Sequence, residues 1–72
     1  MNDRISKTEL ASRLDAAINY PAGMNGLNIL IYGWTRKQPK LRINIHHRDW
    51  LYLSEVQSLS VYAGCDLTKK YA

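Results

Sequence analysis

The central part of the chain, residues 27–47, contains two short segments in which apolar and polar positions alternate. A period of two is typical of a half-buried β-strand. The polar segment between them, Thr35–Lys40, includes Pro39, which has no N–H for a central ladder and therefore favours a turn. We predict a β-hairpin here, and its inward side chains are Leu27, Ile29, Ile31, Leu41, Ile43 and Ile45.

The segment before the hairpin has the periodicity of a helix. Ser6 and Glu9 are spaced as a capping box, which satisfies free N–H groups in the first turn. Apolar residues then recur every four positions, and this stripe consists of Leu10, Leu14 and Ile18. These signals predict a helix over Lys7–Ile18. The glycine- and proline-containing segment Pro21–Gly26 predicts a connecting loop.

The segment after the hairpin predicts a second helix. Ser54 and Gln57 are spaced as another capping box, and Gly64 is a natural left-handed stop. The side chains on the inward face of this helix are Val56, Leu59, Ser60 and Ala63. The last residues, from Asp66 on, can form one more turn or fray.

The resulting fold class is α+β in the order α-β-β-α, with both helices packed on one face of the hairpin. The 72 residues make a single domain, with 1–5 and 68–72 as candidates for fraying. A two-stranded sheet is marginally stable alone, and so is a domain of this size. We therefore expect a homo-oligomer, in which a homodimer can extend the sheet to four strands.

Composition narrows the class of protein further. A single cysteine, Cys65, excludes an intramolecular disulfide, and the sequence has no zinc-ligand spacing. There is no secretion signal and no apolar run of membrane-spanning length. We therefore expect an intracellular, cytoplasmic protein without a membrane segment, a metal or a cofactor.

The net charge of +4 is concentrated in one segment. Residues 34–48 contain five basic residues and no acidic one, whereas the rest of the chain is close to neutral. These basic residues are Arg36, Lys37, Lys40, Arg42 and Arg48. Such a patch attracts polyanions or an acidic protein surface.

Two interpretations remain open for the basic turn and for the aromatic residues beside it. The turn is either a solvated loop or a ribbon tip that contacts phosphates, with Arg42 and Arg48 extending the track. Tyr32 and Trp34 either pack against a partner or the C-terminal segment, or stack on unpaired bases. The candidate binding residues are therefore Tyr32, Trp34, Arg36, Lys37, Lys40, Arg42 and Arg48.

No catalytic constellation is recognisable. His46 and His47 are neighbours on a predicted strand, so their side chains point to opposite faces and cannot easily share a metal. Cys65 follows a helix end, with nothing in the sequence nearby that would lower its pKa. We expect a non-enzymatic protein.

Three stretches resemble the Cro-like helix-turn-helix repressors. Ile5–Leu14 is similar to the first helix of that family, and Gly33–Pro39 to the glycine-basic-proline stretch after its recognition helix. Leu53–Leu67 is similar to the closing helix and turn. The resemblance implies an all-α transcription regulator with Asn25–Tyr32 as recognition helix. We keep it as the alternative fold.

The first functional hypothesis is a small nucleic-acid-binding module whose basic hairpin contacts phosphates. The alternative is a protein-binding inhibitor or accessory subunit, of phage or mobile-element type, that docks on an acidic or nucleic-acid-binding surface of a larger protein. A helix-turn-helix-like regulator is a second alternative. Binding that survives nuclease treatment distinguishes a protein partner from a nucleic acid.

Overall fold

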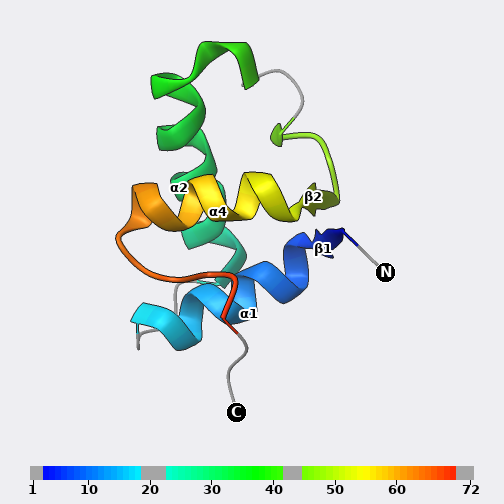
Figure 1. The fold of residues 1–72 in the computed structure, drawn as a ribbon, viewed down its shortest axis with the longest axis vertical. Helices are drawn as coiled ribbons and strands as arrows, with labels where there is room; N and C mark the ends of the chain where they lie inside the picture. The colour runs from blue at the N-terminus through cyan, green and yellow to red at the C-terminus, as the bar shows by residue number, and fades with distance from the viewer. Residues whose placement is uncertain (1–2, 19–22, 42–44, 70–72) are drawn as a thin grey trace.

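The computed structural model describes residues 3–18, 23–41 and 45–69 of the chain. In chain order, its elements are β1 (Arg4–Ser6), α1 (Lys7–Ile18), α2 (Gly23–Lys37), the 3-10 helix η1 (Pro39–Leu41), β2 (Trp50–Tyr52) and α4 (Leu53–Ala63). Figure 1 shows α4 lying across α2, with α1 at the foot of α2 and the two short strands beside them. The described part of the chain is mostly helical.

The predicted hairpin is wrong, and with it the α-β-β-α order. Its first arm, together with the predicted loop residues 23–26, forms α2. Leu41, from the second arm, ends η1, while residues 42–44 lie outside the described part of the chain. The apolar run from Leu27 to Trp34 fits a period of 3.6 as well as a period of two, because it has few polar positions.

Burial shows which period the fold uses. Leu27, Ile31 and Trp34 are almost completely buried, at a spacing of four and three residues. Ile29, which a strand would have turned inward, is 73% exposed. One stripe of α2 therefore faces the core, as in an amphipathic helix.

The small sheet joins two segments that are distant in the sequence. β1 and β2 pair antiparallel, with Ile5 opposite Leu51. Two further backbone hydrogen bonds continue the pairing at its ends. The Lys7 N–H donates to the Asp49 carbonyl at 2.9 Å, and the Leu53 N–H donates to the Asp3 carbonyl at 2.8 Å. The sheet thus fixes the start of α1 next to the start of α4.

One hydrophobic core lies between the sheet and the three helices. Its buried members are Ile5, Leu10, Ala11, Leu14, Leu27, Ile31, Trp34, Ile45, Leu51, Val56, Leu59 and Leu67. Burying a large apolar side chain contributes about 1.5–3 kcal/mol relative to leaving it exposed. Ile5 and Leu67 belong to this core, although each lies at or next to a segment that we expected to fray.

The prediction for α1 is confirmed over its full span, Lys7–Ile18. The Glu9 N–H donates to Ser6 Oγ at 3.2 Å, as the capping signal predicts. The connection to α2 also has a polar contact, because the Gly23 N–H donates to Asp15 Oδ1. A carboxylate at the N-terminus of α2 is favourable for its helix dipole.

The second predicted helix is also present, with a different start. Tyr52 is the N-cap, and its N–H donates to Glu55 Oε1 at 2.7 Å, so the predicted Ser54–Gln57 capping box is wrong. The predicted stop is confirmed, because Gly64 has φ 74°. Ser60 is buried, and its Oγ accepts a hydrogen bond from the Leu67 N–H at 2.8 Å.

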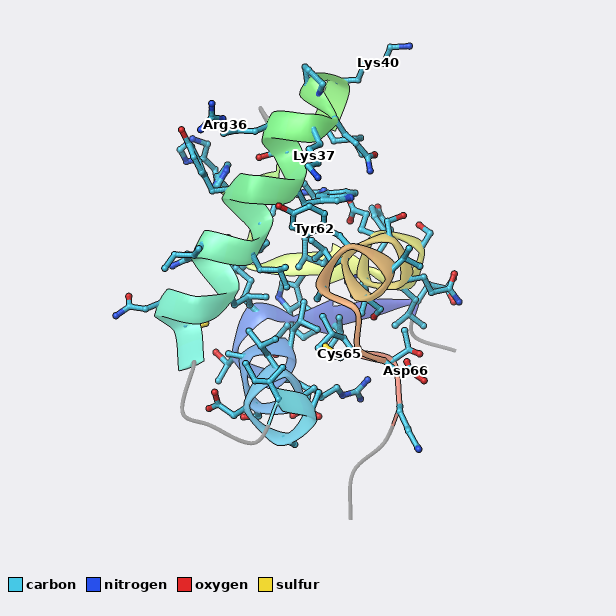
Figure 2. The ribbon with its side chains drawn as sticks, turned by 90° about the vertical axis from the view of Figure 1, so that its left-hand side faces the viewer. Arg36, Lys37, Lys40, Tyr62, Cys65 and Asp66 are labelled. Atoms are coloured by element: carbon cyan, nitrogen blue, oxygen red, sulfur yellow. The ribbon has the colours of Figure 1, made fainter. Side chains whose placement is uncertain are left out.

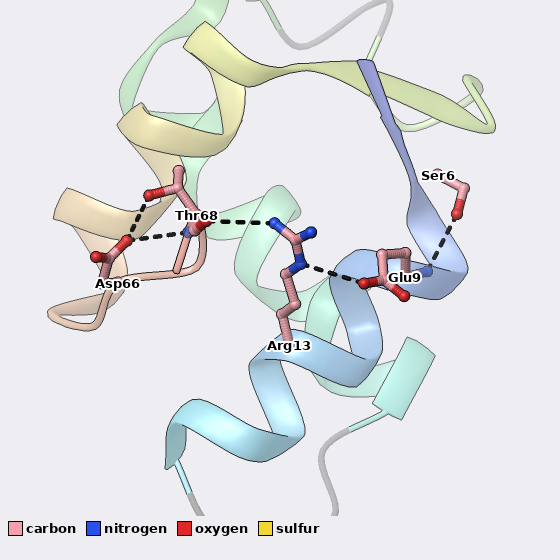
Figure 3. Close-up of polar contacts among 5 residues, drawn as sticks. All are labelled: Ser6, Glu9, Arg13, Asp66 and Thr68. Carbon is pink, nitrogen blue, oxygen red and sulfur yellow. Dashed lines mark hydrogen bonds and ion pairs between the residues drawn. The ribbon is translucent and has the colours of Figure 1, made fainter. Parts of the chain in front are cut away.

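The segment after α4 returns across α1 (Figure 1) and is held there by polar contacts (Figure 3). The Thr68 N–H and hydroxyl both donate to Asp66 Oδ1, at 3.0 and 2.6 Å. Arg13 of α1 donates to the Thr68 carbonyl at 3.4 Å and to Glu9 Oε1 at 3.3 Å. These contacts connect Thr68 to α1 and to Asp66.

Candidate nucleic-acid interface

The exposed face of α2 carries a continuous row of side chains. Their spacing of three or four residues places them on one side of the helix, opposite the buried stripe. The members of this α2 face are Asn25, Asn28, Ile29, Tyr32 and Arg36. It combines amide, aliphatic, aromatic and guanidinium groups on a rigid element.

The C-terminal end of α2 and the following η1 carry most of the positive charge near this face. Arg36, Lys37 and Lys40 are all exposed. Figure 2 shows Arg36 and Lys40 extending away from the body of the protein, whereas Lys37 lies on the side of α2 that faces Tyr62. No acidic residue occurs between Asp15 and Asp49 in the sequence, so no carboxylate in that stretch offsets these charges.

Tyr32 lies at the centre of the α2 face and is 56% exposed. The Arg36 guanidinium is 5.7 Å from the centre of its ring, within the range of a cation–π contact. The His46 ring is also 5.7 Å from it, at an interplanar angle of 57°. These contacts place an aromatic ring and a cation side by side at the surface.

His46 is anchored from two sides. Its Nε2 lies 3.2 Å from Thr35 Oγ1, whose own hydrogen is donated to the Tyr32 carbonyl at 3.1 Å. This contact ties the His46 ring to α2. Lys7 Nζ donates to the His46 carbonyl at 2.9 Å, and burial lowers the pKa of Lys7.

Lys37 belongs to the contact between α2 and α4. Its Nζ lies 5.2 Å from the centre of the Tyr62 ring. The Tyr62 hydroxyl lies close to Gly33, where an added Cβ would be 2.6 Å from that oxygen. The absence of a side chain at Gly33 therefore lets Tyr62 approach α2 and support Lys37.

The structure places four of the predicted site residues on one continuous segment, where Lys37 faces Tyr62, and it separates the others. Tyr32, Arg36, Lys37 and Lys40 lie along α2 and η1. Trp34 is 1% exposed and belongs to the core, so it offers no surface for stacking. Arg48 forms an ion pair with Glu55 and contacts the Tyr52 ring on another part of the molecule. Arg42 lies outside the described residues.

Sequence reasoning missed the polar part of the α2 face. The hairpin prediction assigned Asn25 to a loop and Asn28 to a strand, and only the helix-turn-helix alternative, with Asn25–Tyr32 as recognition helix, placed them on a binding element. The signal was present, because the apolar positions 27, 31 and 34 have helical spacing and place 25, 28, 29, 32 and 36 on the opposite side.

The described residues offer little for other chemistry. Across 3–18, 23–41 and 45–69, no three His, Cys, Asp or Glu side chains form a group that could hold a metal ion. Burial and the neighbouring Asp66 raise the pKa of the Cys65 thiol, which disfavours the reactive thiolate. None of the described helices has the length and apolarity needed to cross a membrane.

Comparison with known proteins adds no relative. No family model matches the chain, and no curated protein or solved structure is similar enough to count as related. The geometry of the chain itself is therefore the basis for any functional assignment.

Proposed function

We propose that this protein is a non-enzymatic module that binds duplex DNA through the α2 face. The observation that carries the proposal is a helix with a mixed polar and aromatic surface that leads directly into three exposed basic residues. A helix of 15 residues is about 22 Å long, and the major groove of B-DNA admits an α-helix.

The side chains on this face are of the types that contact DNA in the major groove. Asn25 and Asn28 carry amides, which pair with adenine through two hydrogen bonds, and Ile29 can contact a thymine methyl group. Arg36 can reach guanine or a phosphate. Lys37 and Lys40 supply charge for the backbone. The resemblance to helix-turn-helix repressors agrees with this use of Asn25–Tyr32.

The proposal is tested by neutralising the basic end of α2. We expect Arg36→Gln, Lys37→Gln and Lys40→Gln together to weaken binding to a duplex oligonucleotide and to flatten its salt dependence. Each lost phosphate contact removes about 0.9 from the slope of log K against log salt for duplex DNA. Fluorescence anisotropy across a salt series measures both quantities.

The matched control is Lys69→Gln, which removes one exposed charge from the tail and leaves α2 unchanged. Neutralising the basic end of α2 also removes a favourable interaction with the helix dipole, which contributes about 0.3–1 kcal/mol per residue. Thermal unfolding of the triple variant measures this loss of stability. Wild-type binding that ignores salt, or that favours the single strand of the same oligonucleotide over the duplex, would contradict the proposal.

A second candidate is supported by the exposed aliphatic side chain on the same face. Ile29 is 73% exposed in the middle of α2, between Asn28 and Tyr32, and a groove on an acidic protein would cover it. This function is a protein-binding inhibitor or accessory subunit. A pull-down from cell lysate with and without nuclease separates the two, because a partner that survives nuclease digestion favours the protein-binding role.

A further inference from the structure

The outward face of the small sheet exposes two aromatic side chains next to each other. Trp50 is 46% and Tyr52 is 51% exposed, while Leu51 between them is fully buried. Alternate residues of a strand point to opposite faces, so the two rings share the outward face. Arg4 of β1 lies opposite Tyr52 in the register of the sheet.

These side chains surround a hollow of about 260 Å³, which is lined by Arg4, Arg48, Asp49, Trp50 and Tyr52. The Arg4 guanidinium lies 5.6 Å from the centre of the Trp50 ring, and that of Arg48 lies 5.9 Å from the Tyr52 ring. Glu55 forms an ion pair with Arg48 and thereby fixes its orientation. The hollow thus has two aromatic walls, two guanidinium groups and one carboxylate.

We propose that this hollow binds an unpaired nucleotide. Aromatic side chains and planar guanidinium groups both stack on nucleobases, whatever the base, because every base has a flat face. The Arg4 guanidinium also has N–H donors in a forked geometry that matches a phosphate, and Arg48, which is paired with Glu55, adds positive charge beside it. The site lies on the sheet and not on α2, so it goes beyond the proposed duplex binding and does not depend on it.

Asp49 decides between a nucleotide and a simple anion. A carboxylate can only accept hydrogen bonds, and it repels any phosphate that approaches it, so a phosphate alone gains nothing from Asp49. The amino group of adenine can donate to it when the base stacks on the aromatic wall. A ligand with a flat ring, a donor edge and a phosphate therefore matches all the groups that line the hollow, whereas inorganic phosphate matches only the arginines.

The experiment is a titration of the ¹⁵N-labelled full chain with AMP, followed by amide chemical shifts. We expect millimolar or tighter binding that shifts the signals of residues 4–6 and 48–53. Adenosine shifts the same signals at higher concentration, because it lacks the phosphate. Inorganic phosphate alone leaves them largely unchanged. No response to AMP, shifts confined to α2, or an equal response to inorganic phosphate would each overturn the proposal.

Two variants test the individual groups. Trp50→Ala removes one stacking wall, and we expect it to weaken AMP binding about tenfold. Arg4→Gln keeps most of the side-chain length and removes the charge, so it weakens AMP more than adenosine. The amide spectrum of each variant reports whether the fold is retained. Wild-type affinity in both variants, with the fold intact, would refute the assignment.

A matched control separates this site from the α2 face. Tyr32→Ala also removes an exposed aromatic ring that contacts an arginine, but on α2. If both proposals hold, the Tyr32→Ala variant binds AMP as tightly as the wild type and binds the duplex more weakly. A protein that binds AMP on the sheet but no duplex retains the present inference and loses the proposed function. A protein that binds the duplex but not AMP retains the proposed function and loses the present inference.

Discussion

Tyr32 and Trp34 show at the scale of single residues how one choice of period changes a predicted site. Two residues apart on a strand they would share a face, as we predicted, but on a helix they lie about 200° apart. Trp34 is 1% exposed in the core and Tyr32 is 56% exposed. The aromatic part of the predicted site is therefore divided between core and surface.

This division predicts different effects for the two alanine variants. We expect Trp34→Ala to lower the free energy of unfolding by about 3–5 kcal/mol, as large core truncations do. Tyr32→Ala should change it by less than about 1 kcal/mol and instead weaken duplex binding. Urea unfolding and anisotropy measure the two effects. Equal destabilisation by the two variants would contradict the assignment of Tyr32 to the surface.

At the scale of elements, local signals predicted α1 well and α2 badly. The start of α1 is marked by Ser6 and Glu9, which are three residues apart in the sequence and joined by a hydrogen bond in the fold. The run from Leu27 to Trp34 has no such marker, since it fits strand and helix alike. Packing against α1 and α4 decides the outcome, and this information is not local. Of the predicted basic segment, Arg36, Lys37 and Lys40 are exposed in this fold, but they lie on α2 and η1 and not at the tip of a hairpin.

The end of α4 offers an element-scale test. Gly64 has φ 74°, and an added Cβ would have nothing within 4 Å, so conformational strain is the whole expected cost. We expect Gly64→Ala to reduce stability by about 1 kcal/mol, and Gly64→Asn by less, because Asn tolerates the left-handed region better. Thermal unfolding measures both. An alanine variant as stable as the wild type would show that α4 ends differently.

At the scale of the whole molecule, the features that sequence reasoning missed are the long-range ones. The pairing of β1 with β2 involves three residues on each side, too few to leave a periodic signal. The exposed Trp50, Tyr52 and Arg4 become one surface only through this pairing. The return of the tail across α1 likewise depends on a contact between Arg13 and Thr68.

The tail contact predicts a dependence of stability on pH. Hydrogen bonds from the Thr68 hydroxyl and N–H lower the pKa of Asp66 below its ordinary value of 3.8. A carboxyl with a lowered pKa in the folded state stabilises the protein above its unfolded pKa, and this contribution is lost as pH falls through the folded value. We expect Asp66→Asn to be less stable than wild type at neutral pH, with a difference that shrinks as the pH falls below 3.8 and through the lowered pKa of the folded state.

Urea unfolding between neutral and acidic pH tests this prediction. Thr68→Val removes one of the two donors to Asp66 and keeps the N–H, so it should show part of the same pH dependence. A stability difference between Asp66→Asn and the wild type that stays constant across the whole range would mean that the titration of Asp66 does not contribute.

The pairing of β1 with β2 also has a consequence for the order of events during translation. β1 is synthesised first of the two strands, and its partner strand follows only after α1 and α2 have been synthesised. Until then the nascent chain has no Leu51 to place opposite Ile5. The sheet can therefore close only after β1, α1, α2 and β2 have all left the ribosome.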